Sequence, residues 1–380
     1  MTASELILKK ALVASDLDSS QWNQIQAGFR NRAFFSSCVA KVNIVSAMRG
    51  RVADYVKSGV DISEARKLMR RDLEQLKYSP NPGEEDTVKD LFSKARLDVI
   101  LKTNEAQARG YIEHLGRMKP GAFAAFPAQE FLRVEARKAQ RKDWPERWRK
   151  AGGKIFGGRM IALKDDPVWV NLSVFGNPFP PFDWGSGMGV RGIDRDEAEK
   201  LGLVTREELK AKVDELKRKP APDFNANLQA TIEMRHDSPE ADELRKVFGI
   251  DKDEKGALVS FEKNVLHWHG ERIREVVEGT LKKVNLGRGY DGRNLSLSHN
   301  IIEEHIIKHV GDNDHDRRNV PLEPGDFELI PAIWRKPDKV ARQKGCDVLE
   351  LDAFDGILRL VVDPNVGIVS FYKMKRPGGA

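Results

Sequence analysis

A segment rich in proline, glycine and aromatic residues constrains the fold of this chain more than any other feature. It runs from Phe175 to Gly189 and holds four glycines, three prolines and four aromatic residues. Proline fixes φ and glycine permits positive φ, so such a run follows one irregular path instead of a helix or a regular strand. A long aperiodic loop is usually functional or disordered, and the aromatic content argues against disorder. We therefore predict an ordered loop whose aromatic side chains either pack on a core or serve a function.

The length and composition indicate several domains. A chain of 380 residues is too long for one ordinary core, so two or three domains are expected. The sequence is 40% hydrophobic and 32% charged, which suits long solvated helices more than a large buried sheet. No apolar run has the length that a membrane span needs, and the first residues lack the order of a signal peptide. Cys38 and Cys346 are too far apart in the sequence to indicate a disulfide framework, which favours a cytosolic setting.

The net charge of +6 is unevenly distributed. Residues 291–380 hold 13 Lys/Arg and 15 Asp/Glu, a balance of −2, so the first 290 residues carry +8. An anionic partner is therefore expected to meet the N-terminal part of the chain.

Most of the N-terminal third has a helical pattern. Residues 4–117 carry apolar positions at helical spacing, with a capping box at Asp61-Ile-Ser-Glu64. The Ser79-Pro-Asn-Pro-Gly83 cluster separates two helices, the second spanning roughly 84–115. A further capping box at Thr205-Arg-Glu-Glu208 predicts a charged helix to about Arg218.

The loop and its flanks carry a family resemblance. Three segments resemble phage Mu F-like minor head proteins. They are the run from Arg159 to Trp169, the Phe175 to Asp183 segment with the Ser186-Gly-Met-Gly-Val that follows it, and the run from Asp194 to Gly202. The Mu F-like proteins are head-morphogenesis proteins of tailed phages and prophages, and the resemblance covers roughly residues 20–205. It implies portal and capsid proteins as partners and a place in the virion head, which is assembled in the bacterial host cytoplasm. Many relatives carry a histidine and paired cysteines here; this chain does not, so no metal is expected.

A basic stretch with two tryptophans lies just before this motif. Residues 133–150 hold eight Lys/Arg against three acidic residues, with Trp144 and Trp148 among them. One interpretation is a solvated helix face beside two core tryptophans. The other is contact with nucleic acid, because clustered cations bind phosphates and release counterions. The resemblance to portal-associated proteins makes genomic DNA a further candidate partner, and the residues that would bind it are Arg137, Lys138, Arg141 and Lys142.

The C-terminal 90 residues have a different pattern. Residues 300–309 predict an amphipathic helix, and four short strands follow at about 327–334, 348–354, 357–362 and 367–372. Turn signals separate the strands. A helix followed by an antiparallel meander is a complete small α+β domain.

Two histidines on the predicted helix are candidates for chemistry. His305 and His309 stand at i and i+4, on one face of an α-helix. A zinc pair is one interpretation, but no third ligand is placed convincingly. Acid–base catalysis is another, because imidazole titrates near neutrality. The third interpretation is two surface or capping histidines without a function.

The order of elements in this segment also carries a resemblance. Four segments in this order resemble phage-associated nucleases of the barnase, EndoU, colicin and RelE type. They are the His305 to His309 helix, Arg317-Arg318, the Glu328 to Asp338 run and Ile368 to Lys373. The resemblance covers about residues 295–376 and implies RNA cleavage without metal or other cofactor. It implies His305 as general acid or base and His309 as second proton carrier or positioning group. Groups for the phosphate are Lys308, Arg318 and Lys373, with hydrogen bonds from Ser370 and Tyr372. Ser370 and Tyr372 share a strand face, whereas Lys373 points the other way unless the strand ends there.

Together these patterns predict a multidomain chain. We expect a mainly α head-morphogenesis domain with an irregular loop region over residues 1–204, a helical linker region over 205–290 and a small α+β nuclease domain over 291–380. The predicted function is that of a minor head protein of a tailed phage or prophage with a C-terminal metal-independent ribonuclease-like domain. Two alternatives are a toxin ribonuclease delivered by a phage-derived head module, and a C-terminal binding module without activity.

Overall fold

The computed structural model describes residues 1–25, 27–136, 140–219, 243, 251–252, 258–259, 271–310, 319–353 and 355–376. The chain divides into two compact units, each considered by itself below. Unit 1 comprises Met1–Ile7, Val52–Ile62 and Leu97–Ala226, and unit 2 comprises Leu8–Arg51, Ser63–Arg96 and Asn227–Ala380. Much of the predicted linker region lies outside the described residues, so the expected domain boundaries at 204 and 290 stay predictions.

Helices make up most of unit 1. The two longest that contribute to it are α4 and α6, and both also extend into unit 2. The helices are α1 (Ala3–Lys9), α4 (Val42–Ser58), α6 (Lys94–Arg117), α7 (Pro120–Ala125), α8 (Trp144–Lys150), α9 (Val168–Leu172), α10 (Arg195–Lys200) and α11 (Arg206–Arg218). The capping box that starts α11 at Thr205 is confirmed, with both reciprocal hydrogen bonds present.

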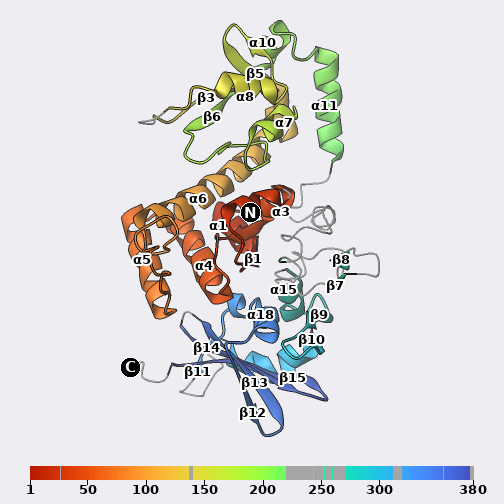
Figure 1. The fold of residues 1–380 in the computed structure, drawn as a ribbon. Coiled ribbons are helices and arrows are strands. Elements are labelled where there is room, and N and C mark those ends of the chain that lie inside the picture. Colours follow the sequence, from red (N-terminus) through yellow and green to blue (C-terminus); the bar gives the residue numbers. More distant parts are fainter. Residues whose placement is uncertain are drawn as a thin grey trace. The chain divides into compact units, whose positions relative to one another are not determined.

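Unit 1 also contains an antiparallel sheet that the sequence patterns did not predict. Its strands are β4 (Ile155–Phe156), β5 (Arg159–Leu163), β3 (Ala128–Arg133) and β6 (Met188–Ile193), hydrogen-bonded in that order (Figure 1). The motif that resembles head proteins therefore forms strand β5, helix α9, the aromatic loop and strand β6. Each of these strands has six residues or fewer, which is too short for alternation to stand out in the sequence.

The aromatic loop packs on the core of unit 1. Phe175, Phe179 and Phe182 are buried, and the Phe182 ring lies against Trp169 with centroids 5.8 Å apart. The loop also approaches α6 so closely that a Cβ at Gly110 would lie 1.9 Å from the Pro180 carbonyl oxygen, so only glycine fits there. Most of the loop's aromatic content thus serves packing.

Unit 2 combines short helices with a larger sheet. Its helices are α2 (Ser19–Gln24), α3 (Ala27–Arg32), α5 (Ile62–Gln75), α15 (Glu271–Val277), α16 (His299–Ile301), the π-helix η1 (Ile302–Ile306), the 3-10 helix η2 (Ile307–His309), α17 (Pro324–Phe327) and α18 (Ile330–Arg335). Paired strands lie outside the main sheet: β1 (Ala11–Val13) with β2 (Ala33–Phe35), β7 (Asp251–Lys252) with β8 (Leu258–Val259), and β9 (Lys283–Arg288) with β10 (Asn294–Ser298).

The main sheet of unit 2 has five antiparallel strands; the last four in the chain form a meander, and the first pairs with the last (Figure 1). Its order is β11 (Asn319–Val320), β15 (Gly367–Met374), β14 (Gly356–Asp363), β13 (Cys346–Ala353) and β12 (Lys339–Gln343). The predicted strands at 348–354, 357–362 and 367–372 are confirmed as β13, β14 and β15, apart from residue 354, which lies outside the described residues. Helices together with antiparallel sheets give the mixed α and β architecture that the sequence predicts.

The expected strand at 327–334 is wrong, because this segment is helical. It forms the end of α17 and most of α18, and Pro331 occupies the first turn of α18. Ile330, Ile333 and Trp334 are fully buried in the core of unit 2. A short apolar run that is buried on all sides has no periodicity that distinguishes a strand from a helix, which explains the error.

Two further features differ from expectation. The helix expected over 84–115 begins only at Lys94, where the Ser93 hydroxyl accepts a hydrogen bond from the Arg96 amide at 3.2 Å. The amphipathic α-helix expected over 300–309 is irregular, because one short α-turn is followed by the π-helix η1 and the 3-10 helix η2.

A buried ion pair fastens α4 to the helices over the sheet of unit 2. The Arg49 guanidinium lies 2.8 Å from the Glu328 carboxylate, and both side chains are at most 5% exposed. Arg49 also donates to the carbonyl oxygens of Leu8 and Lys10. These hydrogen bonds offset the free energy that is lost when the two charges are removed from water.

Candidate active site

A row of polar side chains crosses the outer face of the main sheet of unit 2. Glu350 of β13 is paired in register with Arg359 of β14, and Arg359 is paired with Tyr372 of β15. Side chains alternate along a strand, so these three lie on the face opposite to the core residues Leu349, Leu360 and Phe371. Strand pairing therefore brings together three functional groups that are far apart in the sequence.

Direct contacts join the row. The Arg359 Nε donates to Glu350 Oε1 at 2.8 Å, and Lys339 of the edge strand β12 lies 3.8 Å from Glu350 Oε2. Glu350 itself is only 8% exposed. Burial lowers the pKa of Arg359, but its hydrogen bonds with Tyr372 and Glu350 outweigh that effect and raise the pKa. Arg359 is thus a fixed cation held between a carboxylate and a phenol.

An imidazole completes the row at the Tyr372 end. The His309 and Tyr372 rings have centroids 5.5 Å apart and planes tilted by 39°. His309 closes the 3-10 helix η2, and its carbonyl oxygen accepts a hydrogen bond from the Leu322 amide at 2.7 Å. We call Glu350, Arg359, Tyr372 and His309 the polar row. Carboxylate, guanidinium, phenol and imidazole are the groups that proton transfer and anion stabilisation require.

The two predicted catalytic histidines are placed differently. His305 is exposed, and its Nε2 lies 3.7 Å from the carboxylate of the adjacent Glu304. In a regular α-helix His305 and His309 would share a face, but the change from π to 3-10 geometry at Ile307 breaks that spacing. Within the described part of the chain, His309 is the member of this pair that packs against the polar row.

The other predicted catalytic residues divide into three groups. Ser370 lies on the same face as Tyr372, opposite Val361 of β14, and is half-buried. Arg318 and the side chain of Lys308 lie outside the described residues. Lys373 is on the other face of β15, as alternation requires.

The structure does not bring Lys373 to the polar row. Its side chain is 1% exposed, and its ammonium nitrogen lies 2.9 Å from Asp326 and 2.7 Å from Asp355. Burial lowers the pKa of Lys373, but the two carboxylates outweigh that effect and raise it. Lys373 links β15 to α17 on the core side of the sheet and faces away from the polar row.

The sequence patterns missed Glu350 and Arg359. Each is a charged residue at a strand position that alternation places on the face away from the core. That signal is visible in the sequence, but the pairing of the two residues depends on strand register. Register is set by turn and bulge geometry, which the sequence patterns did not resolve.

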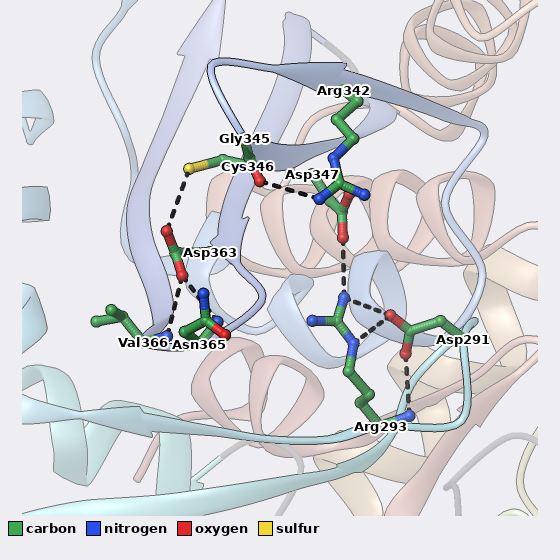
Figure 2. Close-up of polar contacts among 9 residues, drawn as sticks. All are labelled: Asp291, Arg293, Arg342, Gly345, Cys346, Asp347, Asp363, Asn365 and Val366. Carbon is green, nitrogen blue, oxygen red and sulfur yellow. Dashed lines mark hydrogen bonds and ion pairs between the residues drawn. The ribbon is translucent and has the colours of Figure 1, made fainter.

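A second polar cluster in unit 2 is already neutralised. Figure 2 shows the Arg293 guanidinium between Asp291 and Asp347, with Arg293 Nη2 at 2.8 Å from the Asp347 carboxylate. The nearby Cys346 thiol is 3.9 Å from the Asp363 carboxylate. Asp291 and Asp347 are thus both paired with the Arg293 guanidinium, which lies where a metal ion would bind. Across the described residues, no group of three or more His, Cys, Asp or Glu side chains is arranged to hold a metal ion.

The basic stretch of unit 1 largely serves the aromatic loop. Arg141 and Arg147 both form ion pairs with Asp183, at 2.6 and 2.8 Å, and Arg141 also donates to the Trp184 carbonyl. Trp144 and Trp148 are buried in the core of unit 1. Lys142 is exposed and remains free to meet a partner. Arg137 and Lys138 lie outside the described residues, so their predicted contact with nucleic acid stays a prediction.

Comparisons of this chain with protein-family models, with curated proteins and with solved structures find no match. Among the described helices, none combines the length and the apolar character that crossing a membrane requires. The candidate function therefore depends on the geometry of the polar row and on the sequence motifs.

Proposed function

We propose that the C-terminal part of this chain cleaves RNA without a metal ion, and that the polar row is its active site. The observation that carries this proposal is the hydrogen-bonded sequence Glu350, Arg359, Tyr372, with His309 packed at its end. A proton acceptor and a proton donor flank a fixed cation on the outer face of the sheet. Glu350 and Tyr372 stand two strand spacings apart, which is about 10 Å at the backbone. In this proposal the phosphodiester group binds against Arg359, which lies on the strand between them.

The chemistry assigns one role to each residue. The Glu350 carboxylate takes the proton of the ribose 2′-hydroxyl, whose oxygen then attacks the adjacent phosphorus. The His309 imidazolium donates a proton to the departing 5′-oxygen, so the products are a 2′,3′-cyclic phosphate and a 5′-hydroxyl. Arg359 stabilises the charge that develops on the phosphorane oxygens, and a preorganised cation contributes more there than it would in water.

Three neighbouring residues support these roles. Tyr372 contacts both Arg359 and His309, so it positions the cation and the proton donor relative to each other. Ser370 lies on the same face and supplies a hydroxyl for a phosphate oxygen. Lys339 lies beside Glu350 on the exposed edge strand and adds a second cation near the bound phosphate.

For residues 1–204 we propose a role in head assembly of a tailed phage or prophage. The support is the resemblance of the motif between Arg159 and Gly202 to head-morphogenesis proteins. In this proposal the chain enters the virion head and contacts portal and capsid proteins, and the packaged genomic DNA is a further partner. The chain would then be a minor head protein that carries a ribonuclease. Mass spectrometry of purified particles tests the assembly role, and absence from both procapsids and virions would refute it.

The test of the ribonuclease uses the full chain and matched pairs of variants. Wild-type protein in EDTA should cleave a labelled RNA and leave 2′,3′-cyclic phosphate ends. His309→Ala and Glu350→Gln should each lower the rate by at least about a hundredfold, since general acid–base catalysis contributes on the order of 10² to 10⁴. The controls are His305→Ala and Glu304→Gln, two exposed residues outside the polar row; both should keep nearly full activity.

Each of four results would overturn part of the proposal. Loss of activity in His305→Ala with activity retained in His309→Ala would move the site to the other histidine. Cleavage that requires an added divalent metal would refute metal independence. A folded chain that binds RNA but never cleaves it would identify a binding module, and toxicity to the host without incorporation into particles would favour the delivered-toxin alternative.

A further inference from the structure

A cavity lies in unit 2, away from the polar row. It has a volume of about 270 Å³ and lies between the turn at residues 37–41, the segment from Tyr78 to Leu91 and the first turn of α6. Its apolar walls are Val39, Ile44 and Leu91. At about 30 Å³ per water molecule, the space corresponds to about nine waters, enough for an oxoanion with a small organic group attached.

A half-buried arginine forms one wall, and no acidic side chain of the described residues pairs with it. Arg96 Nη2 donates to the Ser36 hydroxyl and the Ser37 carbonyl at 2.9 Å each, and Nη1 donates to the Val88 carbonyl at 3.2 Å. All three acceptors are neutral. The Nε–H group is buried without any hydrogen-bond partner. Burial lowers the pKa of Arg96, which reflects a cation whose charge is poorly compensated.

The other charged groups around the cavity leave a positive balance. Lys89 lies 3.3 Å from Glu84, so these two neutralise each other. Lys41 is exposed and lines the cavity, and no ion pair is recorded for it within the described part of the chain. The cavity is thus lined by Lys41, Lys89 and Arg96 against Glu84, a formal balance of +2.

A polar network behind the cavity fixes its shape. The Tyr78 hydroxyl, which belongs to the lining, lies 3.4 Å from the buried Asp90 carboxylate and accepts a hydrogen bond from the Leu91 amide. Asp90 in turn accepts hydrogen bonds from the amides of Asp86 and Phe92. The Asp90 charge is therefore satisfied by its own segment and does not neutralise Arg96.

We propose that this cavity binds the phosphate group of a small phosphate monoester. A phosphate presents several oxygens in different directions, which suits cations that converge from Lys41, Lys89 and Arg96. The apolar walls would contact the organic part of the ligand. The half-buried guanidinium of Arg96, whose hydrogen-bond partners are neutral, gains an anionic partner when the ligand binds, so binding relieves an uncompensated charge. This site is independent of the ribonuclease proposal.

Cys38 provides a local probe of occupancy. Its thiol is exposed and the residue lines the cavity, while the only other cysteine of the chain is Cys346. In a full-length Cys346→Ser background, the rate of thiol modification therefore reports Cys38 alone. The probes are glycerol 3-phosphate as monoester and inorganic phosphate as the free anion, with glycerol as the uncharged control.

The expected result is saturable protection of Cys38 by glycerol 3-phosphate, with calorimetry giving the same dissociation constant. Lys41→Gln and Lys89→Gln should each weaken binding about five- to tenfold. Lys94→Gln changes an exposed lysine two residues before Arg96 that does not line the cavity, and it should leave binding unchanged. Arg96→Lys keeps the charge and tests whether the planar guanidinium is needed, with a thermal melt as the check of folding.

Each contrary outcome is informative. Equal affinity for inorganic phosphate and glycerol 3-phosphate would refute the monoester and leave a simple anion site. An equal loss in Lys94→Gln would show that net charge, not the cavity, attracts the ligand. Absence of saturable protection in the folded wild-type chain would refute the site altogether, whatever the outcome of the RNA cleavage assay.

Discussion

Replacing Lys373 by Met separates a structural role from a catalytic one. Methionine keeps most of the side-chain volume but removes the ammonium group, which leaves the buried Asp326 without its cation. Asp326 is 9% exposed, while Asp355 has a side chain 38% exposed and can be hydrated. Breaking a buried ion pair from one side typically costs about 3–5 kcal/mol. We expect a value near the lower limit, about 3 kcal/mol, because solvent reaches Asp355.

Hydrogen exchange on the full chain measures this loss where it occurs. The amides of β14 and β15 report local opening even when other parts of a multidomain chain unfold separately. A loss of about 3 kcal/mol corresponds to exchange that is faster by roughly a hundredfold, at about 1.4 kcal/mol per tenfold. Lys375→Met is the matched control, since Lys375 is exposed just beyond β15. Its exchange rates should match those of the wild type.

The pH dependence has a definite sign. Burial raises the pKa of Asp326 above its ordinary value of 3.8, although Lys373 acts in the opposite direction. A raised carboxyl pKa contributes stability that is fully present below pH 3.8 and is lost as the pH rises through the folded value. In Lys373→Met the opposing effect of the cation is gone, so the gap in stability between variant and wild type should narrow on acidification. Unchanged exchange in Lys373→Met, combined with loss of RNA cleavage, would refute this reasoning and restore Lys373 as a catalytic residue.

Two further predictions concern unit 1. Burial, together with the nearby cations Arg117 and Lys164, lowers the pKa of His114 to about 4, so its NMR titration should have a midpoint near that value. Because the folded pKa is lowered, the stability that His114 contributes is present above its ordinary pKa of 6.5 and falls as the pH drops toward 4. A midpoint near 6.5 would contradict the burial of this side chain. If the basic stretch binds DNA, Lys142→Gln should reduce by about 0.9 the slope of log affinity against log salt concentration. Arg141→Gln should reduce that slope and also speed hydrogen exchange in the loop that Asp183 anchors. An unchanged slope in both variants would show that the stretch is purely structural.

The strands of the C-terminal meander were predictable because local signals agree. In β13 and β14, alternating apolar residues are bounded by turn signals at Asp355-Gly and Asp363-Pro. The segment at 327–334 was not predictable, because an apolar run without alternation carries no period. The helix at 300–309 was predicted as regular, whereas Ile302 and Ile306 both reach the core through a π-turn that no residue in the sequence announces.

The candidate site was predictable in part for the same physical reasons. His309, Ser370 and Tyr372 were identified from the sequence, and the structure places them on or beside one face of the sheet. Glu350 and Arg359 were missed, since their importance arises only from cross-strand pairing. Local patterns identify candidate side chains, but contacts between strands depend on register, which is a non-local property.

One irregularity of β15 decides whether the polar row can exist. Ile368 is paired with Val362 and is buried in the core, whereas Ser370 is paired with Val361 and lies on the outer face. Residues two apart on a regular strand share a face, so this arrangement needs the register shift between Val361 and Val362, which leaves Val369 without a partner. Without the bulge, a strand that kept Ile368 in the core would turn Tyr372 inward and bring Lys373 to the outer face. The bulge thus satisfies two demands at once: it keeps the apolar start of β15 buried, and it places Tyr372 between Arg359 and His309.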